Sequence, residues 1–384
     1  MSNIEQLHKG VMTELLEFLN ICFTGRADSR HFEDRYSKFW VDDEEHMSCH
    51  YAIREEGKLV ASVGIYPYTV YIGDRKFTFA TVGNMGVDPS ARGKGYMNTL
   101  YLNANKVLKE KKIDVARLGG LRSRYDRYGY EPCGFMYNFT FLKRNGQEYL
   151  RNNDVPKYEI KTFTETEKEI MDFVRNIYSK QGIHIDRGDD HNFYQSLIFF
   201  ASTPYVALVD GKPVGYFSTS GGQIYDLTAD TPENVVGILS TFVSKEEKDF
   251  NLMVAPDMVE NIRLLSKVSE NMNLTISSHY KIMNWAGIIE ASLALKSTVA
   301  PLTEGELILG IEDYGNFKIS VKNGEPECKE TEEKADLTLR THEASRLLFG
   351  PLEPSATAEI PKDKASFAAA NFPLYLYTPP FDKV

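Results

Sequence analysis

The chain has little cysteine, no basic tract and no long apolar run, and each absence argues against a class of protein. Its four cysteines are scattered, which argues against a disulfide framework or a zinc site and is typical of a reducing cytoplasm. No apolar run reaches the ~18 residues of a membrane-spanning helix, and the N-terminus does not resemble a signal peptide. The net charge is −10, so nucleic acid is not an expected partner. The eight histidines lack metal-ligand spacing, so no metal is expected. We therefore expect a cytoplasmic protein.

A repeated hairpin indicates how the 384 residues are organised. One hairpin is expected to turn at Glu56-Gly57, and a similar one within residues 205–218 turns at Asp210-Gly211. A helical pattern precedes each hairpin, over residues 4–23 and 165–180. The repeat predicts a duplicated domain, and the alternative is that two unrelated hairpins share the pattern Gly-Lys-x-Val.

The pattern changes from about residue 286. A helix is expected over 288–295, followed by alternating strands over 307–313, 317–321 and 335–340, and by helices over 343–349 and about 362–370. This is the pattern of a small α+β domain, and it contains no catalytic motif. We therefore expect three domains, at residues 1–155, 156–285 and 286–384.

The most specific signal lies in residues 85–97. A strand ending at Val87 runs into Asp88-Pro89 and then into a basic glycine loop, residues 92–95, which opens a helix. Glycines allow a close approach of the backbone, and a helix N-terminus favours negative charge, so this arrangement suits a pyrophosphate. The Walker and dinucleotide patterns do not fit, because neither the Gly-Lys-Ser/Thr run nor the third glycine is present. The alternative is an ordinary joint between a strand and a helix.

The loop resembles the pyrophosphate-binding motif of the GCN5-related N-acetyltransferases, Arg/Gln-x-x-Gly-x-Gly/Ala. Arg92 and Gly95 match its first two fixed positions, whereas Met97 stands where the family usually has Gly or Ala. In the second copy Asp230-Thr-Pro-Glu replaces the loop, so that copy looks degenerate. Together with the third domain, these features resemble the enhanced intracellular survival family, a bacterial branch with a large apolar residue often at the position of Met97. The resemblance implies an α+β or α/β protein, in which tandem acetyltransferase folds with mixed sheets precede a domain similar to sterol carrier protein.

The resemblance also implies which residues hold acetyl-CoA as a co-substrate. Backbone groups of Met85, Gly86 and Val87 would pair with the pantetheine amides, and the N–H of Val87 would face the thioester oxygen. The residues implied at the pyrophosphate are Arg92, Gly93, Lys94, Gly95, Tyr96, Met97 and Asn98. Gly120 and Leu121 follow the fifth strand, where the parallel strands of this fold splay and the pantetheine arm fills the gap.

Two catalytic groups follow from the same resemblance. Residues 125–135 are similar to the family segment Tyr-x-Arg-Phe-Gly-Tyr-Gly, whose first tyrosine, here Tyr125, is the proposed general acid. The alternative for Tyr125 is a core or lid aromatic, and Tyr128 and Tyr130 are expected to pack. The family is thought to use its own C-terminal carboxylate as the base, which here belongs to Val384. Asp382 is a competing carboxylate, and a disordered terminus is the alternative.

These features predict an N-acetyltransferase that transfers acetyl to a primary amine by direct attack in a ternary complex. The acceptor would be an amine-bearing small molecule, such as an aminoglycoside or polyamine, or a lysine side chain. The resemblance implies a homo-oligomer, often a hexamer. The alternative is a non-catalytic regulatory protein that binds acetyl-CoA or an apolar ligand. Trp40 and Tyr66 are candidates for the acceptor pocket or for the core, and residues 187–191 are expected to form a solvated loop.

Overall fold

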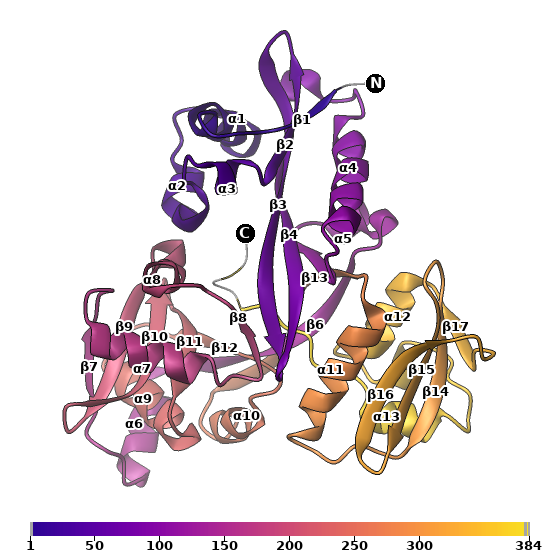
Figure 1. The fold of residues 1–384 in the computed structure, drawn as a ribbon. Coiled ribbons are helices and arrows are strands. Elements are labelled where there is room, and N and C mark those ends of the chain that lie inside the picture. Colours follow the sequence, from indigo (N-terminus) through magenta and orange to yellow (C-terminus); the bar gives the residue numbers. More distant parts are fainter. Residues whose placement is uncertain (1–2, 380–381, 383–384) are drawn as a thin grey trace.

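The computed structural model describes residues 3–379 and 382, which form two β-sheets with helices packed around them (Figure 1). The first region contains β1 (Ile4–Gln6), α1 (Met12–Thr24), α2 (His31–Arg35), η1 (Ser37–Phe39), α3 (Glu44–Met47), β2 (His50–Glu55), β3 (Lys58–Ile72), β4 (Arg75–Val87), η2 (Pro89–Ala91), α4 (Tyr96–Glu110), β5 (Val115–Leu118), α5 (Arg122–Tyr125), η3 (Asp126–Tyr128) and β6 (Glu131–Phe141).

The second and third regions follow along the chain. The second contains α6 (Lys143–Asn152), β7 (Glu159–Thr162), α7 (Lys168–Tyr178), β8 (Ile183–Ile185), α8 (Asp190–Leu197), η4 (Phe199–Ala201), β9 (Thr203–Val209), β10 (Lys212–Ser220), β11 (Gln223–Ala229), α9 (Pro232–Val243), β12 (Phe250–Val254), α10 (Val259–Leu265) and β13 (Asn271–Ile282). The third contains α11 (Trp285–Ser297), β14 (Gly305–Ile311), β15 (Gly315–Lys322), β16 (Glu325–Thr331), β17 (Leu337–Leu339), α12 (Thr341–Phe349), η5 (Pro354–Ala356) and α13 (Ala365–Asn371).

The expected helix over residues 4–23 is wrong in its first half. Residues 4–6 form β1, in which Ile4 pairs with Ile53 of β2, and α1 begins only at Met12. Gly10, with φ of +97°, separates the two elements. Leu7, just after β1, and Leu15 of α1 are buried in one cluster, whereas Ile4 of β1 packs on another.

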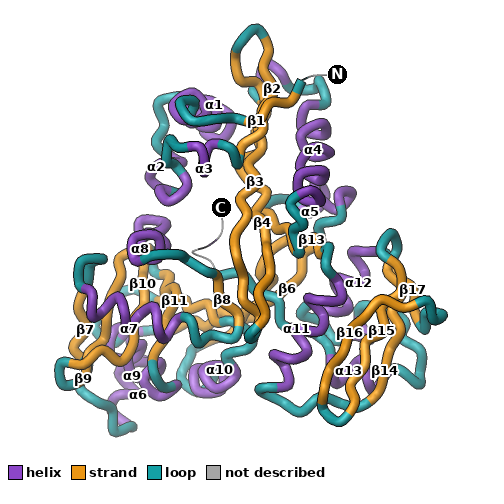
Figure 2. Tube along the Cα trace, viewed as in Figure 1, coloured by secondary structure: helices purple, strands orange, loops and turns teal. Residues whose placement is uncertain are grey.

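The large sheet exchanges strands between the first two regions. Its order is β1-β2-β3-β4-β5-β13-β6-β12-β11-β10-β9-β7, with β8 added beside β3 (Figure 2). Strand β13 pairs antiparallel with β5, and β6 pairs antiparallel with β12. Each half of the sheet is therefore continued by a strand from the other region. The sheet is continuous across residue 155, where a domain boundary was expected.

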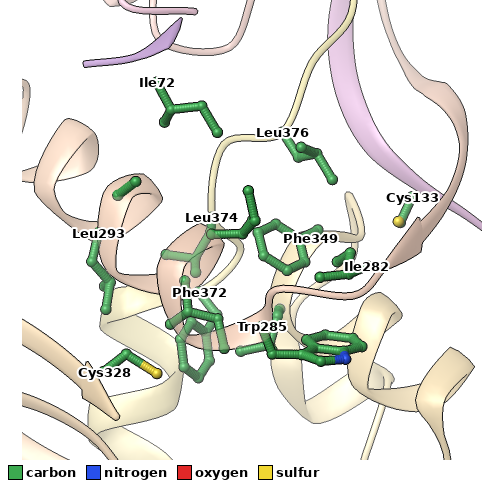
Figure 3. Close-up of a cluster of buried hydrophobic side chains, with 14 of the residues drawn as sticks. Ile72, Cys133, Ile282, Trp285, Leu293, Cys328, Phe349, Phe372, Leu374 and Leu376 are labelled. Carbon is green, nitrogen blue, oxygen red and sulfur yellow. The ribbon is translucent and has the colours of Figure 1, made fainter. Parts of the chain in front are cut away.

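The third region has its own four-stranded sheet, ordered β16-β15-β14-β17, with α11 packed against it. The expected strands and turns are present, and β16 is an additional strand that follows the turn at Asn323-Gly324. One apolar core joins this region to the large sheet (Figure 3). Within it Trp285 and Phe349 pack near Leu374 and Leu376 of the C-terminal tail, residues 372–382. Burial of each such side chain contributes about 1.5–3 kcal/mol, which holds the tail in place.

Candidate active site

A cleft opens where β4 and β5 separate. The two parallel strands pair only from Phe79 with Val115 to Thr81 with Arg117, while β4 continues to Val87. The resulting cavity has a volume of about 280 Å³. It is lined by residues 82–85 of β4, by residues 118–121 at the end of β5, and by Tyr101 and Tyr125. The backbone edge of β4 facing the cleft has no strand partner there, so it can accept an extended ligand arm.

A β-bulge shapes β4 at this point. Gly64 of β3 pairs with Gly83, but Ser62 pairs with Gly86, so β4 has one extra residue. Asn84 lies in the bulge with φ of +49°, a backbone conformation that asparagine tolerates better than most residues. A bulge beside an opening between strands re-aims backbone groups, and this bulge includes Met85, one of the residues expected to contact the pantetheine arm.

A buried hydrogen-bond chain holds the bulge. The Asn84 side-chain amide donates to the Tyr66 hydroxyl at 2.6 Å, and Tyr66 lies 2.8 Å from Nε2 of His50. Burial lowers the pKa of His50 to about 4, so its ring is neutral at pH 7. Because Nδ1 of His50 faces the carbonyl of Met47 at 3.4 Å, we assign Nδ1 as the donor and Nε2 as the acceptor of the Tyr66 proton. Trp40 stacks on the His50 ring, with 5.7 Å between ring centroids.

The loop after β4 leads into the N-terminus of α4 and has open space beside its two glycines. Asp88 accepts the backbone N–H of Ser90 at 2.8 Å and so begins the turn η2. Gly93 and Gly95 have φ of +84° and +80°, and a Cβ at either position would meet no atom within 4 Å. Gly95 caps α4 without a side chain, so the first N–H groups of the helix are not capped by one.

The residues implied at the pyrophosphate line this loop and the start of α4. Arg92 is exposed beside the glycines. Lys94 makes an ion pair of 2.8 Å with Glu55 across the loop. Asn98 accepts the hydroxyl of Tyr128 at 2.8 Å, which ties the helix to the segment that follows β5. An uncapped helix end, an exposed arginine and open space above two glycines fit a pyrophosphate group.

Tyr125 lies at the inner end of the cleft. It is the last residue of α5 and its ring packs 5.5 Å from that of Tyr101. A Cβ at residue 120 would lie 2.3 Å from Cε2 of the ring, and Gly120 has φ of +149°, so glycine is required for the ring to approach the end of β5. Tyr128 stacks on Tyr101 at 4.0 Å, and Tyr130 is fully buried. Of the three tyrosines, Tyr125 is the one that lines the cleft.

A second cavity, of about 360 Å³, lies between the first and second regions. Phe39, Tyr66 and Tyr68 form an aromatic wall, and the second region contributes residues 185–188, Asn192 and Ser196. Tyr66 lines this cavity and accepts a hydrogen bond from Asn84, which lines the cleft between β4 and β5. One hydrogen bond therefore separates residues that line the two cavities. Trp40 does not line either cavity among the described residues.

The C-terminal tail reaches the second cavity. Phe135 of β6 donates its N–H to the carbonyl of Leu376 at 3.2 Å, and the backbone N–H of Thr378 donates to Ser277 of β13 at 3.2 Å. The Asp382 carboxylate then accepts from Arg187 at 2.7 Å and from Lys38 at 3.3 Å, and it lines the cavity. Burial opposes its ionisation, but the attraction of Arg187 and Lys38 outweighs burial and keeps the pKa of Asp382 below its ordinary value.

The expectation that residues 187–191 form a solvated loop is wrong for Arg187. Its side chain is only 1% exposed and its guanidinium lies 4.2 Å from the ring centroid of Tyr178. A burial signal was present in the sequence, since Arg187 follows the alternating strand Ile183–Ile185, but its partners are 39 and 195 residues away. Val384, expected to supply the base, lies outside the described residues.

Comparison with known proteins assigns the first region. Residues 3–133 match the family profile of the acetyltransferase (GNAT) domain. The first region therefore contains an N-acetyltransferase domain of the GNAT class, in agreement with the loop motif and the cleft. No curated protein matches the chain in sequence. No helix among residues 3–379 is long and apolar enough to cross a membrane.

Solved structures extend the likeness to the whole chain. A probable N-acyltransferase from Enterococcus faecalis V583 has a TM-score of 0.70 at 16% identity, and the match covers 98% of this chain and 97% of that chain. A GCN5-related N-acetyltransferase from Kribbella flavida has 0.69 at 15% identity, and Eis1 from Mycobacterium abscessus has 0.68 at 14%, each covering 100% of both chains. The predicted mixed α/β fold, and the resemblance to the enhanced intracellular survival family at the level of fold, are therefore confirmed, whereas the likeness of the third region to sterol carrier protein stays a prediction.

Proposed function

We propose that the protein transfers the acetyl group of acetyl-CoA to a primary amine. The observation that carries the proposal is that Asn84, in the bulge of β4, lines one cavity and donates to Tyr66, which lines the other. One cavity suits an extended thiol cofactor and the other an acceptor, which would enter past Tyr66. The aromatic wall suits an amine-bearing ligand, and exposed Glu45 and Asp186 at the edge of the cavity favour a cationic one.

Acetyl-CoA supplies the acetyl group as an activated thioester. The residues of the chain hold the reactants in place and transfer the protons. The loop from Arg92 to Asn98 and the free edge of residues 85–87 hold the two ends of the cofactor. Tyr125 is close enough to the end of β5 to hold a proton for the sulfur that leaves. As the amine nitrogen bonds to the acetyl carbon and the C–S bond breaks, the tyrosine gives this proton to sulfur and the amine gives one to a carboxylate.

We assign the base to the C-terminal carboxylate of Val384. Support comes from Asp382, which lies in the acceptor cavity two residues before the end of the chain. Two residues span at most about 7 Å, which limits how far the chain after Asp382 can extend from this cavity. Asp382 is a poor candidate for the base, because Arg187 and Lys38 stabilise its ionised form.

The same proposal gives the other regions their roles. The second region is a degenerate acetyltransferase copy without a cofactor loop, at residues 156–285, and the third, at residues 286–384, is a sterol-carrier-like domain that delivers the tail. We expect a cytoplasmic homo-oligomer. The bulges support the duplication: in the second region Tyr216 pairs with Thr228 but Ser218 with Tyr225, and Asp226 has φ of +51°.

The test is release of CoA, detected with a thiol reagent, in the presence of polyamines, aminoglycosides and lysine peptides. Tyr125→Phe should lower kcat by about 100-fold or more, as loss of a general acid does. Tyr130→Phe is the matched control, because the Tyr130 hydroxyl is buried without a partner and outside the cleft. If the protein binds acetyl-CoA but releases no CoA with any amine, the regulatory alternative replaces the proposal.

A further inference from the structure

A buried charge cluster connects the second region to the acceptor cavity. The side chains of Arg187, Asp226 and Asp382 are exposed by 1%, 7% and 4%. Arg187 bonds to Asp226 through Nη1, and to Asp382 through Nη2 at 2.7 Å and Nε at 3.2 Å. Lys38 approaches Asp382 from the first region, and Nη2 of Arg117 lies 3.5 Å from the Asp382 carbonyl oxygen. Three regions of the chain thus meet at one carboxylate.

Stability is a weak reason for such a cluster. Removing several charges from water costs free energy that their attraction often fails to recover, and apolar side chains of similar volume are commonly as stable. The cluster does fix geometry. The Arg187 fork binds Asp382 through two nitrogens, its plane lies against the Tyr178 ring at 4.2 Å, and Asp226 holds it from the bulge of β11. A lysine could not reproduce this planar, two-point contact.

We infer that Arg187 and Asp382 are positioning residues that place the C-terminal carboxylate for proton removal from the amine. The inference rests on the proposed role of Val384. Asp382 is the described residue nearest in sequence to that carboxylate, and earlier in the tail Oγ1 of Thr378 lies 2.8 Å from the Tyr280 hydroxyl. The degenerate region then contributes to catalysis directly. Asp226 lies in the bulge of β11. It orients Arg187, which in turn holds the tail through Asp382.

The experiment is a cycle of substitutions in two forms of the full chain. One form ends in the native carboxylate, and the other ends in a C-terminal amide made by intein cleavage, which removes the charge but no residue. Asp382→Asn and Arg187→Lys are made in both forms. Arg144→Lys is the control, because Arg144 pairs with exposed Glu270 at 2.7 Å, away from both cavities. CoA release gives kcat and KM, and urea unfolding and acetyl-CoA binding identify variants that fail to fold.

In the native form each substitution should lower kcat about 10- to 100-fold, as misplacement of a catalytic group does, with the KM for acetyl-CoA changed less than about 2-fold. In the amide form the same substitutions should change kcat less than about 2-fold, because there is no base left to misplace. Asp382→Glu keeps the charge and should recover part of the loss. If Asp382→Asn does not fold, Arg187→Lys, which retains the buried positive charge, completes the cycle.

Two results would overturn these ideas, and they are distinguishable. If the substitutions lower kcat equally in both forms, their role is structural, and the inference fails while the terminal base stands. If the amide form is as active as the native form, the proposed base itself is wrong and the inference fails with it. If the substitutions lower kcat only in the native form, the result supports both the terminal base and the positioning roles of Arg187 and Asp382.

Discussion

The two openings between parallel strands, one in each half of the large sheet, have the same geometry but different contents. Between β4 and β5 the cavity is about 280 Å³, whereas between β11 and β12 it is only about 20 Å³. The C-terminal tail makes the difference, because fully buried Tyr377 and Pro379 line what remains of the second opening. In the second opening, residues of the tail therefore occupy space that stays open in the first.

The bulges beside the two openings differ in the same way. Asn84 in the first is held by neutral groups, since its amide donates to Tyr66, whose hydroxyl lies beside His50. Asp226 in the second is held by the charged side chain of Arg187, which also binds Asp382. The first arrangement leaves backbone groups available to a ligand, whereas the second makes the bulge part of a fixed internal contact.

Replacing the tyrosine that fills the second opening should have the largest effect on stability. Tyr377→Ala removes a buried ring where no cofactor can replace it, so we expect a loss of about 3–5 kcal/mol in the free energy of unfolding, measured in urea. Tyr375→Ala, in the same tail but only partly buried, should cost clearly less. Equal losses in the free energy of unfolding would mean that filling the opening between β11 and β12 adds nothing particular to stability.

A substitution in the β11 bulge should lower the free energy of unfolding more than a substitution in the β4 bulge. Asp226→Asn leaves Arg187 with one fewer carboxylate in a buried site, so a loss of about 3 kcal/mol is expected. Asn84→Ala removes one neutral hydrogen bond and should cost about 1 kcal/mol. Denaturant unfolding of both variants gives the comparison, and the reverse order would contradict the contrast between charged and neutral bulges.

Mild acid should weaken the first bulge selectively. The pKa of His50 is about 4 in the folded chain and about 6.5 in the unfolded chain, so below pH 6.5 only the unfolded chain takes up the proton. Stability is therefore full above pH 6.5 and falls as pH approaches 4, by up to about 3 kcal/mol. Urea unfolding from pH 7 to 4 should show a shallower decline in His50→Gln than in the native chain. Parallel curves would exclude His50 as the source.

The smallest effect concerns the loop that only the first region has. Arg92→Ala should weaken acetyl-CoA binding about 10-fold, the value of one charge-assisted hydrogen bond, in a calorimetric titration. The matched change in the second region is Asp230→Asn at the start of α9, an exposed residue that should leave the affinity unchanged. An effect of Asp230→Asn would mean that the second region still takes part in cofactor binding.

The sequence predicted what depends on neighbouring residues. The hairpins at Glu56-Gly57 and Asp210-Gly211, the loop at 92–95 and the helix after it are local patterns, and the structure has them at those positions. The first strand was misjudged because three residues are too few to show a period of two. Nothing local to β5 or β6 indicates that each pairs with a strand from the other region, since those pairings are set by packing far along the chain.

The residues of the candidate site also fall into two groups: those that a local motif predicts, and those that depend on residues far along the chain. Tyr125 and the glycines could be proposed from a motif, because each motif is one continuous segment, and Tyr125 does line the cleft. Arg187 could not, since an arginine in a short polar run is typical of a surface loop, and its burial depends on Asp226 and on a carboxylate 195 residues later. Burial of a charge is decided by where its partners are, which a local reading of sequence does not contain.

The exchange of β6 and β13 has a consequence for the order in which the protein is made. Strand β5 is synthesised by residue 118, but its neighbour β13 begins only at residue 271. At about 5–20 residues per second, the ribosome needs roughly 10–30 s to close this interval, during which one edge of β5 has no partner. The nascent first half must wait with an open sheet edge, a state in which chaperones and unwanted strand partners compete for it.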